Sequence, residues 1–183
     1  MSKFKVPNRN QVDPKAQEIF DDLNKKMGLV PNLYAAMGYS SNALASYLAF
    51  SSAQTKGTFN AKEREAISLA VSETNQCGYC LAAHTAVAKM NGFSDEDTLD
   101  LRAGTIEDQK LNLLTRLAIS IVENRGKADV YLIDKFFAFG YNEGALIDLI
   151  ALVTDKMFTN FIGRLMDVPV DFPVVQSLEE VAV

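Results

Sequence analysis

Residues 77–84 read CGYCLAAH and contain both cysteines and the only histidine of the chain. Two thiols separated by two residues can form a disulfide, and this spacing is typical of cysteines whose pKa is lowered. If the segment is helical, His84 lies one turn beyond Cys80 on the same face, where an imidazole can act as a general base for the thiol. A helix that begins near Cys77 also turns the positive end of its dipole toward a thiolate. Thiol–disulfide chemistry is therefore the first function that the sequence indicates.

Zinc binding is the main alternative for the same residues. Cys77, Cys80 and His84 offer three ligands, and a carboxylate would complete the usual four. Structural zinc sites usually join two ligand pairs from separate segments, however, and a second pair is missing from this sequence. We therefore expect no metal and no other cofactor, and keep a metal-binding or redox-sensing module as an alternative. A thioredoxin-like fold is disfavoured because no strand pattern precedes the motif.

Two further side chains lie close to the motif in sequence. Glu65 precedes Cys77 on the preceding predicted helix, and taken alone it is most simply a solvated glutamate paired with Lys62. Tyr79 lies inside the motif. Its ring can pack at the helix start, and its hydroxyl can donate a hydrogen bond to a substrate.

Composition limits the class of protein and its partners. The chain has 183 residues, 48% of them hydrophobic and 22% charged, which suits one compact domain over residues 1–183. Its net charge of −5 argues against nucleic acid or an anionic membrane as a partner. The most apolar window, residues 144–163, is interrupted by Asp148, Asp155 and Lys156, which indicates a buried helix rather than a membrane span. Two cysteines and no secretion signal at the N-terminus favour the cytoplasm.

The fold is predicted to be all-α, because helix start and stop signals follow one another and strand-like alternation is nearly absent. We expect helices over residues 13–28, from 31, from 41, 60–74, 77–92, 94–104, 105–126, 130–140 and 142–166. The last of these is apolar around most of its circumference, so we expect it to be buried within the fold or partly at a subunit interface. Two prolines after Val168 predict an extended arm over residues 168–183.

The order of Glu65, Cys77, Cys80 and His84 resembles the signature of the alkylhydroperoxidase D-like (AhpD-like) proteins of the carboxymuconolactone decarboxylase superfamily, in its peroxidase-related branch. The flanking sequences REAI (64–67) and KMNG (89–92) are similar too, as is DVPVDFP (167–173) near the end of the chain. The resemblance covers a core of about residues 30–173. It departs from the pattern of the best-studied type at Tyr79, where that type has a second histidine directly before the second cysteine.

This resemblance implies an AhpD-like helical bundle, assembled as a trimer or hexamer, with a peroxidase activity that needs no haem or flavin. It implies that Cys80 attacks the peroxide, that Cys77 is the resolving thiol, and that Glu65 and His84 relay protons. The implied partners are a small hydroperoxide and an external dithiol or thioredoxin-like reductant. A general disulfide reductase remains an alternative. A decarboxylase-type lyase is disfavoured, because that branch generally lacks the cysteine pair.

Overall fold

The all-α prediction is confirmed by a computed structural model, which describes residues 4–178. Within that range the chain forms nine α-helices, one short 3-10 helix and no β-strand. The elements are η1 (Arg9–Gln11), α1 (Pro14–Met27), α2 (Asn32–Met37), α3 (Ser41–Gln54), α4 (Ala61–Thr74), α5 (Gly78–Met90), α6 (Asp95–Ala103), α7 (Gln109–Glu123), α8 (Val130–Ala138) and α9 (Glu143–Leu165).

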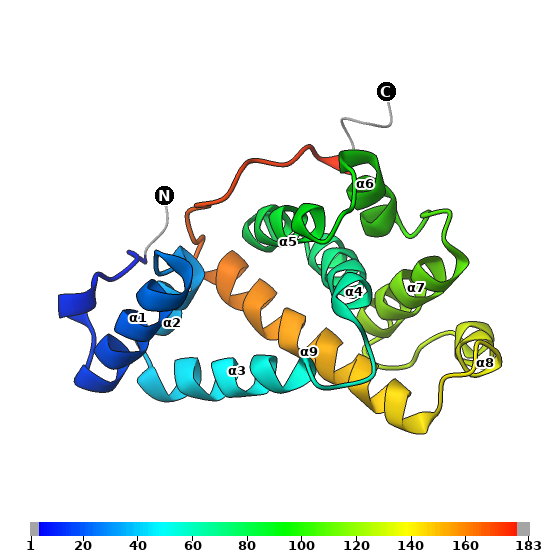
Figure 1. Cartoon of the computed structure of the whole chain (residues 1–183), viewed down its shortest axis with the longest axis horizontal. Helices are drawn as coiled ribbons and strands as arrows, with labels where there is room; N and C mark the ends of the chain where they lie inside the picture. The colour runs from blue at the N-terminus through cyan, green and yellow to red at the C-terminus, as the bar shows by residue number, and fades with distance from the viewer. Residues whose placement is uncertain (1–3, 179–183) are drawn as a thin grey trace.

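Helix α4 is the centre of the bundle. It packs against α5, α6, α7 and α9, and residues 66–72 along it are all buried (Figure 1). A run of apolar and small side chains can be buried on every side in this way only when neighbouring helices cover each face. Side chains on α4 are therefore held firmly, including those at its border with α5.

Side-chain caps explain why most helices begin where the sequence predicts. Asp13, the residue before Pro14, accepts a hydrogen bond from the Ala16 amide and so caps the start of α1. At the start of α4, Asn60 and Glu63 form a reciprocal capping box. One predicted boundary is wrong: the helix expected from residue 105 begins at Gln109. Asp108 accepts hydrogen bonds from two amides of that first turn and so sets the later start.

The long helix α9 lies across the bundle and has two different faces (Figure 1). One face is buried against α3, α4 and α5. The other leaves large apolar side chains exposed, namely Ile147, Ile150, Phe158, Phe161 and Leu165. Complete burial within a single chain is therefore wrong for this helix, and burial at a subunit interface remains a prediction. No helix in residues 4–178 has the length and apolarity needed to cross a membrane.

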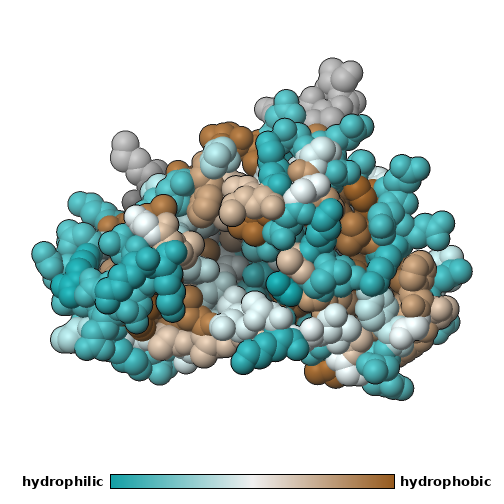
Figure 2. All heavy atoms as spheres, in the orientation of Figure 1, coloured by the Kyte–Doolittle hydropathy of each residue, from teal (hydrophilic) through white to brown (hydrophobic). Residues whose placement is uncertain are grey.

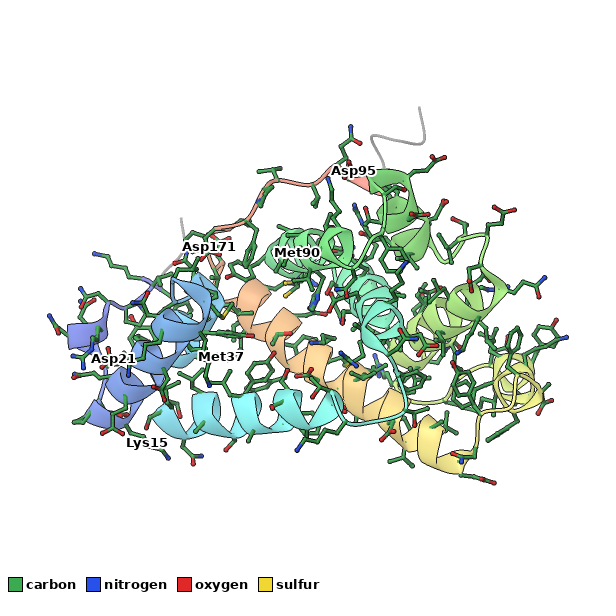
Figure 3. All side chains as sticks on the ribbon, viewed as in Figure 1. Lys15, Asp21, Met37, Met90, Asp95 and Asp171 are labelled. Atoms are coloured by element: carbon green, nitrogen blue, oxygen red, sulfur yellow. The ribbon has the colours of Figure 1, made fainter. Side chains whose placement is uncertain are left out.

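After α9 the chain forms a non-helical tail, residues 166–177, which runs back over α5 toward α6 (Figure 1). Asp171, labelled in Figure 3, accepts a hydrogen bond from the Asn32 amide at the start of α2. Further along, the Gln176 carbonyl accepts one from the Arg102 guanidinium. The described part of the predicted arm is thus extended and packs on its own chain, whereas residues 179–183 lie outside the described range.

Candidate active site

Both cysteines lie at the amino end of α5, as the sequence predicts. Cys77 is the N-cap residue, and its sulfur accepts a hydrogen bond from the Cys80 amide at 3.3 Å. Both thiols are reduced and almost completely buried. The first turn of a helix carries unpaired amide groups and the positive end of the dipole, so this position stabilises negative charge on sulfur.

The two sulfurs are electrostatically unequal. The Cys80 thiol donates toward the Cys77 sulfur and lowers the pKa of Cys77, and the Cys80 amide and the Arg164 charge act in the same direction. The same interaction, together with burial, raises the pKa of Cys80 well above that of a free thiol. Cys77 is therefore the more acidic of the two thiols, and Cys80 holds its proton more tightly.

A carboxylate and an imidazole meet where α4 packs on α5. Glu65 Oε2 lies 2.8 Å from His84 Nδ1, and both side chains are largely buried. Burial alone would raise the pKa of Glu65, but the charge and hydrogen bond of His84 outweigh it and lower that pKa. The carboxylate thus orients the ring and favours a proton on Nδ1.

Cys80 and His84 both line a cavity of about 180 Å3. Its wall is mostly apolar and aromatic, with side chains from α2, α3, α5, α9 and the tail, among them Leu33, Tyr34, Tyr47 and Phe172. Figure 2 shows this face of the molecule hollowed near its centre, between α3 and α5. A cavity of about 150 Å3 is large enough to bind benzene, so this one suits a ligand about the size of a single ring.

Comparison with known proteins gives a match to one family model and to several solved structures. Residues 41–119, which include all four residues of the predicted signature, match the model of the carboxymuconolactone decarboxylase family. No curated protein sequence matches the chain. Several solved structures do match its fold.

A peroxidase-related protein from Silicibacter sp. TM1040 is 20% identical, with a TM-score of 0.78 over 92% of this chain and 91% of its own. An AhpD-core peroxidase-related protein from Ralstonia eutropha JMP134 is 17% identical, with a TM-score of 0.81 over 93% and 92%. The chain thus has the fold of the AhpD-core peroxidase-related proteins, and its residues 41–119 match the carboxymuconolactone decarboxylase family. The debrominase Bmp8 has the same fold, at 17% identity and a TM-score of 0.73 over 86% of this chain and 87% of its own.

The structure brings together Glu65, Cys77, Cys80 and His84, the four residues predicted to carry the chemistry. Within residues 4–178, no group of three His, Cys, Asp or Glu side chains is arranged to hold a metal ion. His84 lies on the face of α5 that borders both Glu65 and the cavity, which is the position the four-residue spacing predicts.

The Tyr79 hydroxyl, which the sequence suggests as a hydrogen-bond donor to substrate, already has a partner within the protein. The ring of Tyr79 lines the cavity and meets Phe172 edge-on, with ring centroids 5.7 Å apart. Its hydroxyl accepts a hydrogen bond from the Leu33 amide at 3.3 Å. Burial first, and then a hydrogen bond to Asp171, raise the pKa of Tyr79, so the hydroxyl stays protonated. Tyr79 thus joins α5 to α2 and to the tail, and its binding of substrate remains a prediction.

Residues of α9, Thr159 among them, border the cysteine pair or the cavity, and none of them is predicted from the motif. Lys156 lines the cavity, and Asn160 is fully buried beside Cys80, where it favours the thiolate form of that residue. Gly163 and Arg164 adjoin Cys77 on the side away from the cavity. Lys156, Asn160 and Arg164 recur at intervals of four, so a polar stripe within an apolar helix is the sequence signal that could have found them.

Proposed function

We propose that this protein is an AhpD-like, thiol-dependent peroxidase that reduces small hydroperoxides through Cys80 and Cys77. The observation that supports this most directly is a buried cysteine pair, beside an oriented Glu65–His84 pair, opening on a ring-sized cavity. Cys80 lines that cavity and Cys77 does not, so a substrate in the cavity meets the Cys80 sulfur.

The reaction begins when the Cys80 thiol gives its proton to His84 by way of the cavity, which both side chains line. The Cys80 thiolate then attacks one oxygen of the hydroperoxide, the O–O bond breaks, and the alkoxide takes a proton from His84. No hydrogen bond joins His84 to Cys80 among the described residues, so this proton reaches the leaving oxygen inside the cavity rather than through the thiol.

The sulfenic acid on Cys80 then condenses with the Cys77 thiol, which releases water and forms a disulfide. Overall, two thiols and one hydroperoxide give a disulfide, an alcohol and water. An external dithiol or thioredoxin-like protein restores both thiols by exchange. No metal, haem or flavin takes part in this scheme.

Thiol counting tests this proposal directly, because the chain has only two cysteines. One equivalent of cumene hydroperoxide should lower the count from two to zero without forming disulfide-linked dimers. C77S should stop at a Cys80 sulfenic acid that dimedone traps, whereas C80S should react slowly and form no dimedone adduct. Thiols that persist in excess peroxide would contradict the proposal, as would a C80S variant that consumes peroxide at the parent rate.

Reductive dehalogenation is a second candidate, favoured by the fold shared with Bmp8 and by the aromatic wall of the cavity. A solved structure of a cysteine-to-alanine variant of Bmp8 contains 2,3,4-tribromopyrrole, a molecule of one ring. In this scheme the Cys80 thiolate takes bromine from carbon, the carbon keeps the electron pair and gains a proton, and Cys77 then displaces bromide to form the disulfide. Release of bromide from tribromopyrrole, with loss of both thiols, would favour this candidate over the peroxidase.

A further inference from the structure

Two basic side chains, each paired with a carboxylate, line the cavity. The first is His84 with Glu65 behind it at 2.8 Å. The second is Lys156, whose Nζ lies 2.9 Å from Asp155 Oδ2. The proposed peroxidase reaction uses only the first pair, so the role of the second has to be found elsewhere.

Lys156 lines the cavity, whereas Asp155 does not. The Asp155 side chain is only 1% exposed, and its Oδ2 also accepts a hydrogen bond from the Ser51 hydroxyl. Glu65 is likewise absent from the cavity wall. The polar side chains that line the cavity are therefore an amine, an imidazole, hydroxyls and a thiol, and no carboxylate.

The ammonium group of Lys156 has unused hydrogen-bonding capacity. It carries three N–H donors, and the structure gives it one acceptor, Asp155, within residues 4–178. The side chain is only 10% exposed, so few water molecules can reach the other two donors. A buried cation that retains free donors at the wall of a cavity is a binding group for an anionic oxygen.

The charge of Lys156 also acts on the reactive end of the cavity. It contributes to lowering the pKa of Glu65 and opposes the rise in the pKa of Cys80. A ligand oxygen bound to Lys156 therefore lies near both the thiol and the relay. The cavity volume of about 180 Å3 limits such a ligand to about one ring.

We infer that Lys156 binds an anionic oxygen of the substrate, and that the substrate class is a small, ring-sized molecule carrying a carboxylate or phenolate. The inference rests on the proposed function for the placement of the reacting group at Cys80. It specifies which hydroperoxide, or which halogenated ring, the site should prefer: one whose acidic group can reach Lys156 while its reacting group meets Cys80.

Protection of the thiols from alkylation tests this inference without requiring turnover. The probes are benzoate and benzamide, which have nearly the same shape but differ in charge. Benzoate should slow the reaction of the cysteines with iodoacetamide at concentrations about tenfold lower than benzamide, as one charge-assisted hydrogen bond would give. K127M, which removes an exposed lysine outside the cavity, should retain this preference.

Two variants keep the test independent of folding. K156R retains the charge and should retain the preference for benzoate. The double variant D155N/K156M removes both charges together, so that no buried carboxylate is left unpaired. It should unfold near the parent temperature and protect its thiols equally with either probe.

Several results would overturn the anion site: equal protection of the parent by benzoate and benzamide, no protection by either, or an undiminished benzoate preference in D155N/K156M. A different result separates this inference from the proposed function. A chain that consumes no hydroperoxide, yet shows Lys156-dependent protection by benzoate, contradicts the peroxidase and supports the anion site.

Discussion

Gly163 of α9 lies against the Cys77 sulfur so closely that a Cβ atom on this residue would be 2.9 Å from Sγ. The same atom would be 3.8 Å from the Cys80 sulfur. Glycine is therefore the residue that lets α9 approach the cysteine pair, and the position of the Cys77 sulfur depends on the absence of a side chain at 163.

G163A should slow disulfide formation. The added methyl group forces the Cys77 sulfur or α9 to move, and a displacement near 1 Å of a reacting group costs up to about a hundredfold in rate. Stopped-flow thiol loss with hydroperoxide measures the effect. G78A is the matched control, since a Cβ there meets no atom within 4 Å. Equal rates for parent and G163A would show that the Cys77 position is not limiting.

C80A should raise the pKa of Cys77, because the Cys80 thiol is the largest cause of its lowering. The pH profile of Cys77 alkylation should move to higher pH in C80A and less so in C80S, whose hydroxyl can still donate. A lowered native pKa contributes stability above the unfolded thiol pKa of about 8.5. This contribution to stability is lost as the pH falls through the pKa that Cys77 has in the folded protein. If the midpoint of the alkylation profile in C80A were no higher than in C80S, the Cys80 thiol would not be the cause of the lowered pKa of Cys77.

E65Q and H84A should each slow Cys80 oxidation by about 10²- to 10⁴-fold, the usual contribution of a general acid or base. Both side chains lie at the α4–α5 border, so the Tm of each variant should be measured alongside the rate. E96Q, an exposed change on α6, is the control and should react like the parent. A parent-like rate in either variant would assign that residue a structural role.

A homo-oligomer, most simply a trimer or hexamer, remains our prediction from the apolar face of α9. Phe161 and Leu165 are 55% and 78% exposed, and a monomer rarely leaves such side chains together at its surface. Light scattering should give a mass that is a multiple of 20.1 kDa for the parent. F161E/L165E should lower that mass, and K15E on α1 should not. A parent mass of one chain at micromolar concentration would refute the prediction.

The local parts of this structure are the parts that sequence reasoning predicts well. Caps such as Asp13 and Asn60 act within four residues, so they can be recognised in the sequence. The spacing of Cys80 and His84 places them on one helix face for the same reason. These short-range signals are enough to locate the motif at the start of a helix.

The part of the site that α9 contributes could not be predicted from the motif, because it depends on how α9 crosses α5. Lys156 and Asn160 belong to a helix whose composition indicates only burial, and their approach to Cys80 is a tertiary contact. The inequality of the two thiols also depends on tertiary structure. It arises partly from Arg164, a residue 87 positions after Cys77 in the numbering.

The tail has a consequence for the order in which the protein matures during synthesis. Phe172 completes the cavity wall, and Asp171 and Tyr79 anchor that wall to the start of α2. A nascent chain can form α5 long before these residues leave the ribosome. Its cysteine pair then lacks a cover on one side, so the thiols are open to oxidants of any size. The cysteine pair therefore acquires the size limit of its cavity only after residues 171 and 172 have been synthesised.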